Sequence, residues 1–138
     1  MPRVPKRILV VDDHDVVRQG VRLILRNQPD YQIVGEADNG LDALEKMLSL
    51  KPDLVVLDLS MPGKDGLAVL RDIAMPDFAH KPKVVILAMH ESNELASKIK
   101  SLGGQGHVVK TRAATHLNRA VQSILEGGTF FENIKAKA

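Results

Sequence analysis

The residues with the clearest chemical potential in this sequence are three aspartates and a lysine that each follow a short apolar run. Asp12 and Asp13 follow the first run, Asp58 follows the third, and Lys110 follows the fifth. Carboxylates held close together repel one another and need a counter-ion. Oxygen ligands suit a hard cation, and Mg²⁺ with several retained waters fits them better than calcium does. A carboxylate beside Mg²⁺ and an ammonium group is suited to phosphoryl transfer, in which the carboxylate attacks phosphorus in line.

A simpler interpretation exists for each acid taken alone, because a single Asp after a strand is usually a helix cap or a loop residue. The set of four is harder to explain in that way. In an open α/β sheet, ligands bind outside the carboxyl ends of the strands. An Asp pair after one strand, an Asp after another and a Lys after a third have no structural need to meet there. The combination therefore predicts a functional site.

A parallel sheet is needed to bring these residues together, and the apolar runs predict one. Five runs of mainly β-branched residues lack polar alternation, as is typical of strands covered on both faces. The runs are Ile8–Val11, Ile33–Val34, Leu54–Leu57, Val84–Leu87 and Val108–Val109. Between and after them, apolar residues recur at helical spacing. The predicted core stripes of these helices are Val17/Val21/Ile24/Leu25, Leu41/Leu44/Leu48, Leu67/Leu70/Ala74, Leu95/Ile99/Leu102 and Leu117/Val121/Ile124/Leu125.

Five consecutive β-α units predict an α/β fold with right-handed crossovers. We expect a flavodoxin-like, doubly wound, five-stranded parallel sheet in the strand order 2-1-3-4-5, with five helices. The turn residues agree with these helix limits. Asn39 and Gly40 are expected to open the second helix, Gly103 to end the fourth and Gly127 to end the last.

The composition fits one domain and excludes several classes of protein. The chain has 138 residues, of which 44% are hydrophobic, and this length is close to the commonest domain size. The absence of Cys excludes disulfides, thiolate metal sites and a cysteine nucleophile. The net charge of +2 is too small to bind nucleic acid by charge alone. Because no apolar run approaches the roughly 20 residues of a membrane span, we expect a cytoplasmic protein without membrane contact.

Four segments of the sequence resemble the receiver domains of two-component response regulators. They are ILVVDDH (8–14), LVVLDLSMPGKDG (54–66), VVILAMH (84–90) and GHVVKT (106–111). The resemblance covers about 7–127, so we expect 1–6 to be an N-terminal extension and 128–138 the start of a linker or a C-terminal tail. The DDH, AMH and GGTFF segments look most like the subfamily with a C-terminal, LuxR-type helix-turn-helix DNA-binding domain. Since no such domain follows, we expect a stand-alone receiver or a fragment.

The resemblance assigns roles to five residues. It makes Asp58 the phosphoacceptor and a ligand of Mg²⁺, which is the cofactor that the family implies. Asp13 would bind the metal directly, Asp12 would act largely through a bound water, and the backbone carbonyl of Ser60 would be a further ligand. Lys110 would contact the phosphoryl oxygens and Asp58.

The resemblance also implies partners. The phosphoryl donor would be a phosphohistidine on a sensor histidine kinase or phosphotransfer protein, or a small molecule such as acetyl phosphate. Such a domain is a regulatory phosphoacceptor and not an enzyme, because it phosphorylates and dephosphorylates itself once per cycle. It would control dimerisation or a DNA-binding output, with DNA contacted only by a domain absent from this chain. A homodimer is expected through the fourth and fifth helices with the fifth strand, or through the first and fifth helices.

Residues beside the predicted site have supporting roles. Met61 and Pro62 would shape the loop next to the phosphoacceptor, although Pro62 also fits a plain turn. The family's residue at the position of His90 influences the access of water to the phosphoryl group. The remaining histidines outside the strands are scattered and suggest no metal site: His14, His80 and His116.

Two positions depart from the family pattern. The fourth strand normally ends in Ser or Thr, whose hydroxyl bonds the phosphoryl group, and the fifth carries Tyr or Phe; this sequence has Ala88 and His107. Loss of a hydrogen bond to a charged acceptor costs about 1.5–3 kcal/mol, or roughly one to two orders of magnitude in a two-state equilibrium. We therefore expect a weakened or rewired switch. The alternatives are that other contacts restore the coupling, and that His107 is simply a packed side chain.

Two other functions fit part of the pattern. An aspartyl-phosphate phosphatase of the haloacid dehalogenase type also uses an Asp after a buried strand with Mg²⁺. That family needs a second Asp two residues after the nucleophile, where this sequence has Ser60. A pseudo-receiver that no longer responds to phosphate would act as a docking or dimerisation module. Ala88 and His107 favour this second function, whereas the intact Asp58 and Lys110 oppose it.

Overall fold

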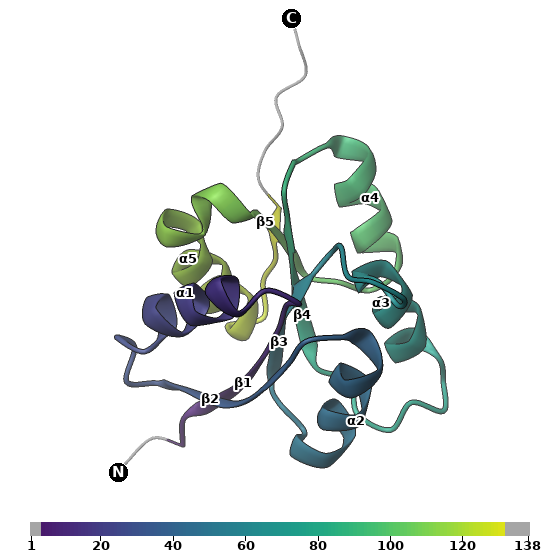
Figure 1. Ribbon diagram of the computed structural model, residues 1–138, viewed down its shortest axis with the longest axis horizontal. Helices are drawn as coiled ribbons and strands as arrows, with labels where there is room; N and C mark the ends of the chain where they lie inside the picture. Colours follow the sequence, from purple (N-terminus) through teal and green to yellow (C-terminus); the bar gives the residue numbers. More distant parts are fainter. Residues whose placement is uncertain (1–3, 132–138) are drawn as a thin grey trace, which may run out of the picture.

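The computed structural model describes residues 4–131, in which strands and helices alternate along the chain (Figure 1). The strands are β1 (Lys6–Val11), β2 (Tyr31–Ala37), β3 (Leu54–Asp58), β4 (Lys83–Ala88), β5 (Gly106–Val109) and β6 (Phe130–Phe131). The helices are α1 (Asp15–Leu25), α2 (Gly40–Leu50), α3 (Gly66–Ala74), α4 (Asn93–Ser101) and α5 (Ala113–Leu125), with a 3-10 turn, η1 (Lys110–Arg112), before α5. Each predicted apolar run lies in one of the first five strands.

The described strands form one parallel sheet in the order β2-β1-β3-β4-β5-β6. The predicted flavodoxin-like order of the first five strands is confirmed. The structure adds the short strand β6, which lies in the segment that we assigned to a linker or tail. Phe130 pairs with Gly106 and Phe131 with His107 along the edge of β5. The remainder of that segment, 132–138, lies outside the described residues.

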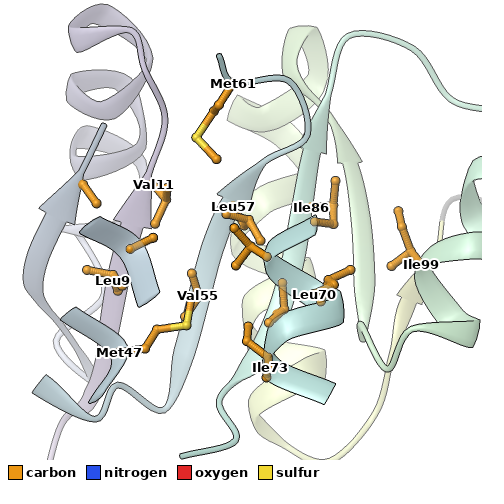
Figure 2. Packing of buried hydrophobic residues seen from close by; sticks show 14 of the residues in the cluster. Leu9, Val11, Met47, Val55, Leu57, Met61, Leu70, Ile73, Ile86 and Ile99 are labelled. Atoms are coloured by element: carbon orange, nitrogen blue, oxygen red, sulfur yellow. The ribbon is translucent and has the colours of Figure 1, made fainter. Parts of the chain in front are cut away.

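The pleat of the sheet divides the apolar side chains into two layers, because successive residues of a strand point to opposite faces. Figure 1 shows α2, α3 and α4 covering one face and α1 and α5 covering the other. The first layer combines Leu9 and Val11 of β1, Val55 and Leu57 of β3 and Ile86 of β4 with Met47, Leu70, Ile73 and Ile99 of the helices (Figure 2). The second combines Ile8, Val10, Leu54, Val56, Val85, Leu87 and Val108 with Val21, Leu25, Leu117, Ala120, Val121 and Ile124.

One strand departs from the predicted burial. β1, β3, β4 and β5 are largely buried, as expected for strands covered on both faces. In β2, however, residues 31–36 are half-buried or exposed, and full burial begins only at Ala37. The reason is that β2 forms the outer edge of the sheet, where one side has no neighbouring strand among residues 4–131.

The helix ends follow the predicted turn residues. Asn39 caps α2, since its side-chain oxygen accepts a hydrogen bond of 2.8 Å from the Asp42 N–H. Gly103 follows α4 with φ 91° and Gly127 follows α5 with φ 97°. Both values lie in the left-handed region that glycine adopts without strain. The three predicted helix limits are therefore confirmed.

The predicted core stripe of α2 holds only for Leu44, which packs against the first apolar layer, whereas Leu48 is 43% exposed. Leu41 is 67% exposed, whereas Gly40, Ala43 and Met47 are buried. A Cβ at Gly40 would lie 2.7 Å from the carbonyl oxygen of Lys64. The small residues at the start of α2 therefore face inward, because they allow the helix to pack closely against the loop before α3. The stripes of the other four helices lie wholly or mostly toward the core.

The domain limits stay a prediction. β1 begins at Lys6, one residue before the predicted boundary at 7, and the Lys6 N–H donates a hydrogen bond of 2.7 Å to the Asp30 carbonyl. Residues 1–3 of the predicted N-terminal extension lie outside the described residues. Within 4–131, each helix is too short or too polar to cross a lipid bilayer.

Candidate functional site

The carboxyl ends of β1, β3 and β5 lie at one edge of the sheet, and the predicted acids and lysine meet there. Asp12 and Asp13 directly follow β1, Asp58 is the last residue of β3, and Lys110 directly follows β5. Asp12 and Asp58 are almost completely buried, at 0% and 1% exposure. Carboxylates are rarely buried to this degree unless they are paired with an opposite charge. The burial therefore points to a compensating partner within the cluster.

Lys110 is that partner, because its ammonium group contacts both buried carboxylates. Its Nζ lies 2.9 Å from Oδ1 of Asp58 and 3.0 Å from Oδ2 of Asp12. The lysine side chain is only 15% exposed, so solvent screens these ion pairs less than it screens surface pairs. Asp13, at the rim, adds a third carboxylate to a cluster in which Lys110 supplies one ammonium. The cluster keeps an excess of negative charge.

Backbone amides hold the two buried carboxylates in place. The His14 N–H donates a hydrogen bond of 2.9 Å to Oδ1 of Asp12, and the Ser60 N–H donates one of 3.2 Å to Oδ1 of Asp58. Oδ2 of Asp58 is buried and accepts no hydrogen bond from any residue in the part of the chain that the structure describes. This oxygen has lone pairs available for a cation or an electrophile.

The electrostatic environment affects Asp58 and Lys110 differently. Burial raises the pKa of Asp58 above its ordinary value, and the charge of Asp12 raises it further. The contacts with Lys110 and the Ser60 N–H lower this pKa but do not cancel the effect of burial. Burial acts to lower the pKa of Lys110, but its bonds to the two carboxylates outweigh this effect and raise that pKa. The site therefore favours a permanent ammonium and would favour an added cation.

His14 joins the same cluster, which its sequence position did not indicate. Its Nδ1 lies 3.2 Å from Oδ1 of Asp12 and 3.0 Å from Oδ1 of Asp13. One possible ligand atom from each of these three residues and Asp58 lies within 4.8 Å of the others. We grouped His14 with scattered histidines, and the structure instead places its ring beside Asp12 and Asp13. The contact depends on the turn after β1, in which Oδ1 of Asp12 also accepts a hydrogen bond from the His14 N–H.

The donor set fits a hard divalent cation. Three carboxylates supply oxygen ligands, which Mg²⁺ prefers. The buried Oδ2 of Asp58, with no hydrogen-bond donor among residues 4–131, offers one of these oxygens directly. Asp13 is 22% exposed and His14 is 66% exposed, so the rim of the cluster is open to solvent, as a cation with retained waters requires.

The other predicted site residues lie around the cluster. Ser60 and Pro62 are exposed in the loop between β3 and α3. Met61, between them, is 7% exposed and packs against the first apolar layer (Figure 2). His90 is exposed in the loop after β4. Met61 therefore anchors this loop to the core, while its neighbours remain accessible.

Ala88 and His107 are both buried in the strands beside the cluster. Ala88 ends β4 and is 2% exposed, and His107 lies in β5 and is 1% exposed. His107 is in register with Ile86, which belongs to the same layer as Ala88. Since paired residues of parallel strands point to the same face, Ala88 and His107 both face the layer covered by α2, α3 and α4.

Cavity size does not identify this site. A hollow of about 430 Å³ lies between α1 and β2, where Leu23, Tyr31 and Ile33 contribute to its lining. None of the acids of the cluster lines it. The cluster is recognised by the types, burial and spacing of its charged groups.

Comparison with known proteins decides the family. The family model described as the response regulator receiver domain matches residues 8–122. The chain belongs to this family of receiver domains. Among curated proteins, the receiver is 34% identical over 127 residues to the oxygen regulatory protein NreC of Staphylococcus aureus, covering 91% of this chain and 58% of NreC. It is 29% identical over 126 residues to the transcriptional regulatory protein DegU of Brevibacillus brevis, covering 90% of this chain and 52% of DegU.

Solved structures agree with this assignment. A two-component response regulator of the LuxR family from Aurantimonas sp. SI85-9A1 superposes with a TM-score of 0.84 at 34% identity, covering 91% of the receiver and 89% of that chain. The non-phosphorylated receiver domain of the stress response regulator RcsB from Escherichia coli gives a TM-score of 0.85 at 26% identity, covering 94% and 99%. The predicted likeness to LuxR-type response regulators is confirmed. The receiver spans about half the length of the curated relatives that it matches.

Proposed function

We propose that this receiver accepts a phosphoryl group on Asp58 with the help of Mg²⁺, and so controls dimerisation or a DNA-binding output domain outside this chain. The donor is a phosphohistidine of a sensor histidine kinase or phosphotransfer protein, or a small molecule such as acetyl phosphate. The proposed site of action is the cytoplasm. The contact of one ammonium, Lys110 Nζ, with the carboxylates of Asp58 and Asp12 is the observation that carries the proposal.

The chain's own residues perform most of the proposed transfer. One carboxylate oxygen of Asp58 attacks the phosphorus atom, the bond from phosphorus to the donor nitrogen breaks, and its electron pair leaves with that nitrogen. Lys110 pairs with Asp58 before the transfer and with a phosphoryl oxygen afterwards, so its charge stabilises both states. When bound, Mg²⁺ neutralises charge on the transferring phosphoryl oxygens. Asp13, Asp58 and the Ser60 carbonyl would hold it directly, and Asp12 largely through water.

The conformational response to phosphorylation is proposed to be weak. Ala88 offers no hydroxyl to the phosphoryl group, and His107 stands where the family has an aromatic residue. Both side chains are buried in the packed core. A neighbouring side chain could take over their roles only if the strand ends repacked. Asp58 and Lys110 are untouched by these changes. Phosphorylation is therefore expected to persist while its coupling to an output is reduced.

Incubation with acetyl phosphate and Mg²⁺, followed by intact-mass measurement, tests the proposal. We expect one phosphoryl adduct on the wild-type receiver, and none on Asp58→Asn or when EDTA replaces Mg²⁺. Asp77→Asn, which changes an exposed aspartate before β4, is the matched control and should keep the adduct. A wild-type receiver that gains no adduct would overturn the proposal. Continuous release of phosphate over many turnovers would indicate a phosphatase.

A docking or dimerisation module that ignores phosphate is the second candidate function. The observation that favours it is the buried Ala88 at the end of β4, where no hydroxyl can bond a phosphoryl group. This function predicts the same oligomeric state before and after treatment with acetyl phosphate. Size-exclusion chromatography with light scattering on the samples used for mass measurement separates the two candidates.

A further inference from the structure

We propose that Arg18 is a positioning residue for the metal site, because its guanidinium ties helix α1 to the backbone carbonyl of Asp12. This inference rests on the proposed function, in which Asp12 and Asp13 take part in binding Mg²⁺. Arg18 lies in the second turn of α1, outside the cluster of carboxylates, and contacts no carboxylate oxygen of Asp12 or Asp13 among the hydrogen bonds of residues 4–131.

The guanidinium is held by three groups at once. Nη1 donates a hydrogen bond of 2.6 Å to the carbonyl oxygen of Asp12. Nε donates one of 3.0 Å to Oε1 of Glu36 in β2, and Nη2 pairs with Asp15 at the start of α1. The Arg18 side chain is 15% exposed. A rigid planar fork with its donors satisfied in fixed directions can define the position of the carbonyl that it binds.

The bond from Arg18 adds to other contacts that hold Asp12 in position. On one side of the residue, the Asp12 N–H donates a hydrogen bond of 3.1 Å to the Ala37 carbonyl of β2. On the other side, the Asp12 carbonyl is bonded by Arg18. The carboxylate between them meets the His14 N–H and Lys110 Nζ. Without Arg18, the peptide group that leads from Asp12 to Asp13 loses its charge-assisted donor, and the turn carrying both acids is free to shift.

Positioning and simple charge predict opposite results for Mg²⁺ binding. Removal of a positive charge near an acidic cluster makes the local potential more negative, which by itself tightens the binding of a divalent cation. Loss of a group that orients metal ligands weakens binding, typically by about 10- to 100-fold. A weaker affinity after removal of Arg18 therefore has no electrostatic explanation. The sign of the effect identifies the role.

Arg22 provides a matched control on the same helix. Its Nη1 pairs with Oε2 of Glu36, the other oxygen of the carboxylate that Arg18 binds. No hydrogen bond joins Arg22 to Asp12 within residues 4–131. Replacement of Arg22 thus removes a cation and an ion pair to Glu36 while leaving the Asp12 carbonyl bonded. Any effect specific to Arg18 must come from the contacts that Arg22 lacks, which are the bond to the Asp12 carbonyl and the ion pair with Asp15, a side chain that is 91% exposed.

The test is isothermal titration of Mg²⁺ into the wild-type receiver and the Arg18→Ala, Arg18→Lys and Arg22→Ala variants, with a thermal unfolding curve of each in EDTA. We expect Arg18→Ala to raise the Mg²⁺ dissociation constant about 10-fold or more and Arg22→Ala to leave it unchanged or lower it. Arg18→Lys keeps the charge but loses the fork, so it should also bind more weakly than wild type. If Arg18→Ala does not fold, Arg18→Lys alone decides the question.

Two outcomes would overturn the positioning role. One is an Arg18→Ala variant that is folded and binds Mg²⁺ as tightly as wild type, or more tightly. The other is an equal loss of affinity in Arg18→Ala and Arg22→Ala, which would assign the effect to the shared partner Glu36. A wild-type receiver without measurable Mg²⁺ binding would instead contradict the proposed function, and the inference would fall with it.

Discussion

A Cβ at Gly66, the first residue of α3, would lie 2.5 Å from the carbonyl oxygen of Asp58. The Gly66 N–H also donates a hydrogen bond of 2.9 Å to the Leu59 carbonyl, so the start of α3 closes tightly over the end of β3. We predict that Gly66→Ala displaces the Asp58 backbone. The free energy of unfolding should fall by about 1–3 kcal/mol, and the yield of phosphoryl adduct per folded molecule should fall with it.

Gly20 gives the comparison for this prediction. It lies inside α1, and a Cβ there would meet no atom within 4 Å. Because glycine is unfavourable inside a helix, Gly20→Ala should raise the free energy of unfolding by roughly 0.5–1 kcal/mol and leave the adduct yield from acetyl phosphate unchanged. Urea unfolding and intact mass measure both quantities. Equal urea midpoints for Gly66→Ala and wild type would contradict the close approach.

Asp58 is expected to lower the stability of the metal-free receiver at neutral pH. Its pKa is raised by burial and by Asp12, so the folded state holds a proton on Asp58 more tightly than the unfolded chain does. Protonated Asp58 therefore stabilises the folded state at pH values below the ordinary carboxyl pKa. This stabilisation is lost as the pH rises through the raised pKa of Asp58 in the folded state. Asp58→Asn should therefore have a higher Tm than wild type in EDTA at neutral pH.

The pH dependence and metal dependence of this difference provide its checks. The Tm advantage of Asp58→Asn should shrink as the pH is lowered, because wild-type Asp58 then becomes protonated in the folded state. Saturating Mg²⁺ should also reduce the advantage by stabilising the wild-type carboxylate. Asp77→Asn, at an exposed position, should show neither trend. An Asp58→Asn variant less stable than wild type in EDTA would show that the ion pair with Lys110 outweighs burial.

Restoration of a hydroxyl at position 88 should strengthen the response to a phosphoryl mimic. We predict that beryllofluoride with Mg²⁺ changes the oligomeric state of Ala88→Thr more than that of wild type, by roughly one to two orders of magnitude in the equilibrium constant. Ala88→Val has nearly the same shape without the hydroxyl and should respond like wild type. Analytical ultracentrifugation measures the three proteins. A wild-type response as large as that of Ala88→Thr would refute the weakened switch.

The inward face of α2 can be tested by two alanine substitutions. Met47 is completely buried in the first apolar layer, so Met47→Ala should lower the free energy of unfolding by about 2–5 kcal/mol. Leu41 is 67% exposed, so Leu41→Ala should change the free energy of unfolding by less than about 0.5 kcal/mol. Chemical denaturation monitored by circular dichroism measures both. A larger loss for Leu41→Ala than for Met47→Ala would show that the leucine face of α2 is the buried one.

The sheet and the cluster of charged groups could be predicted because each depends on local patterns. Buried parallel strands need continuous apolar runs, and the alternation of runs and helices leaves few possible topologies. Once that order is known, residues at the carboxyl ends of β1, β3 and β5 must come together. Asp58 and Lys110 are 52 positions apart in the sequence, yet the strand order alone predicts that they are neighbours.

The features that could not be predicted depend on tertiary contacts. The orientation of α2 follows from the approach of Gly40 to Lys64, which no helical periodicity encodes. β6 has only two residues, too few for a recognisable apolar run, and it forms because the chain after Gly127 returns along β5. The place of His14 depends on the turn after β1, where Oδ1 of Asp12 binds the His14 backbone and ring together.

The sheet separates the apolar core into two layers, one on each face. Ala88 and His107 face the layer that also contains Ile99 of α4 and Phe131 of β6. Nζ of Lys100 in α4 lies 4.7 Å from the centre of the Phe131 ring. The side chains that pack beneath α1 and α5 lie on the other face of the sheet. The two atypical positions therefore share a layer with α4 and β6, whereas the side chains of α1 and α5 pack on the opposite face of the sheet.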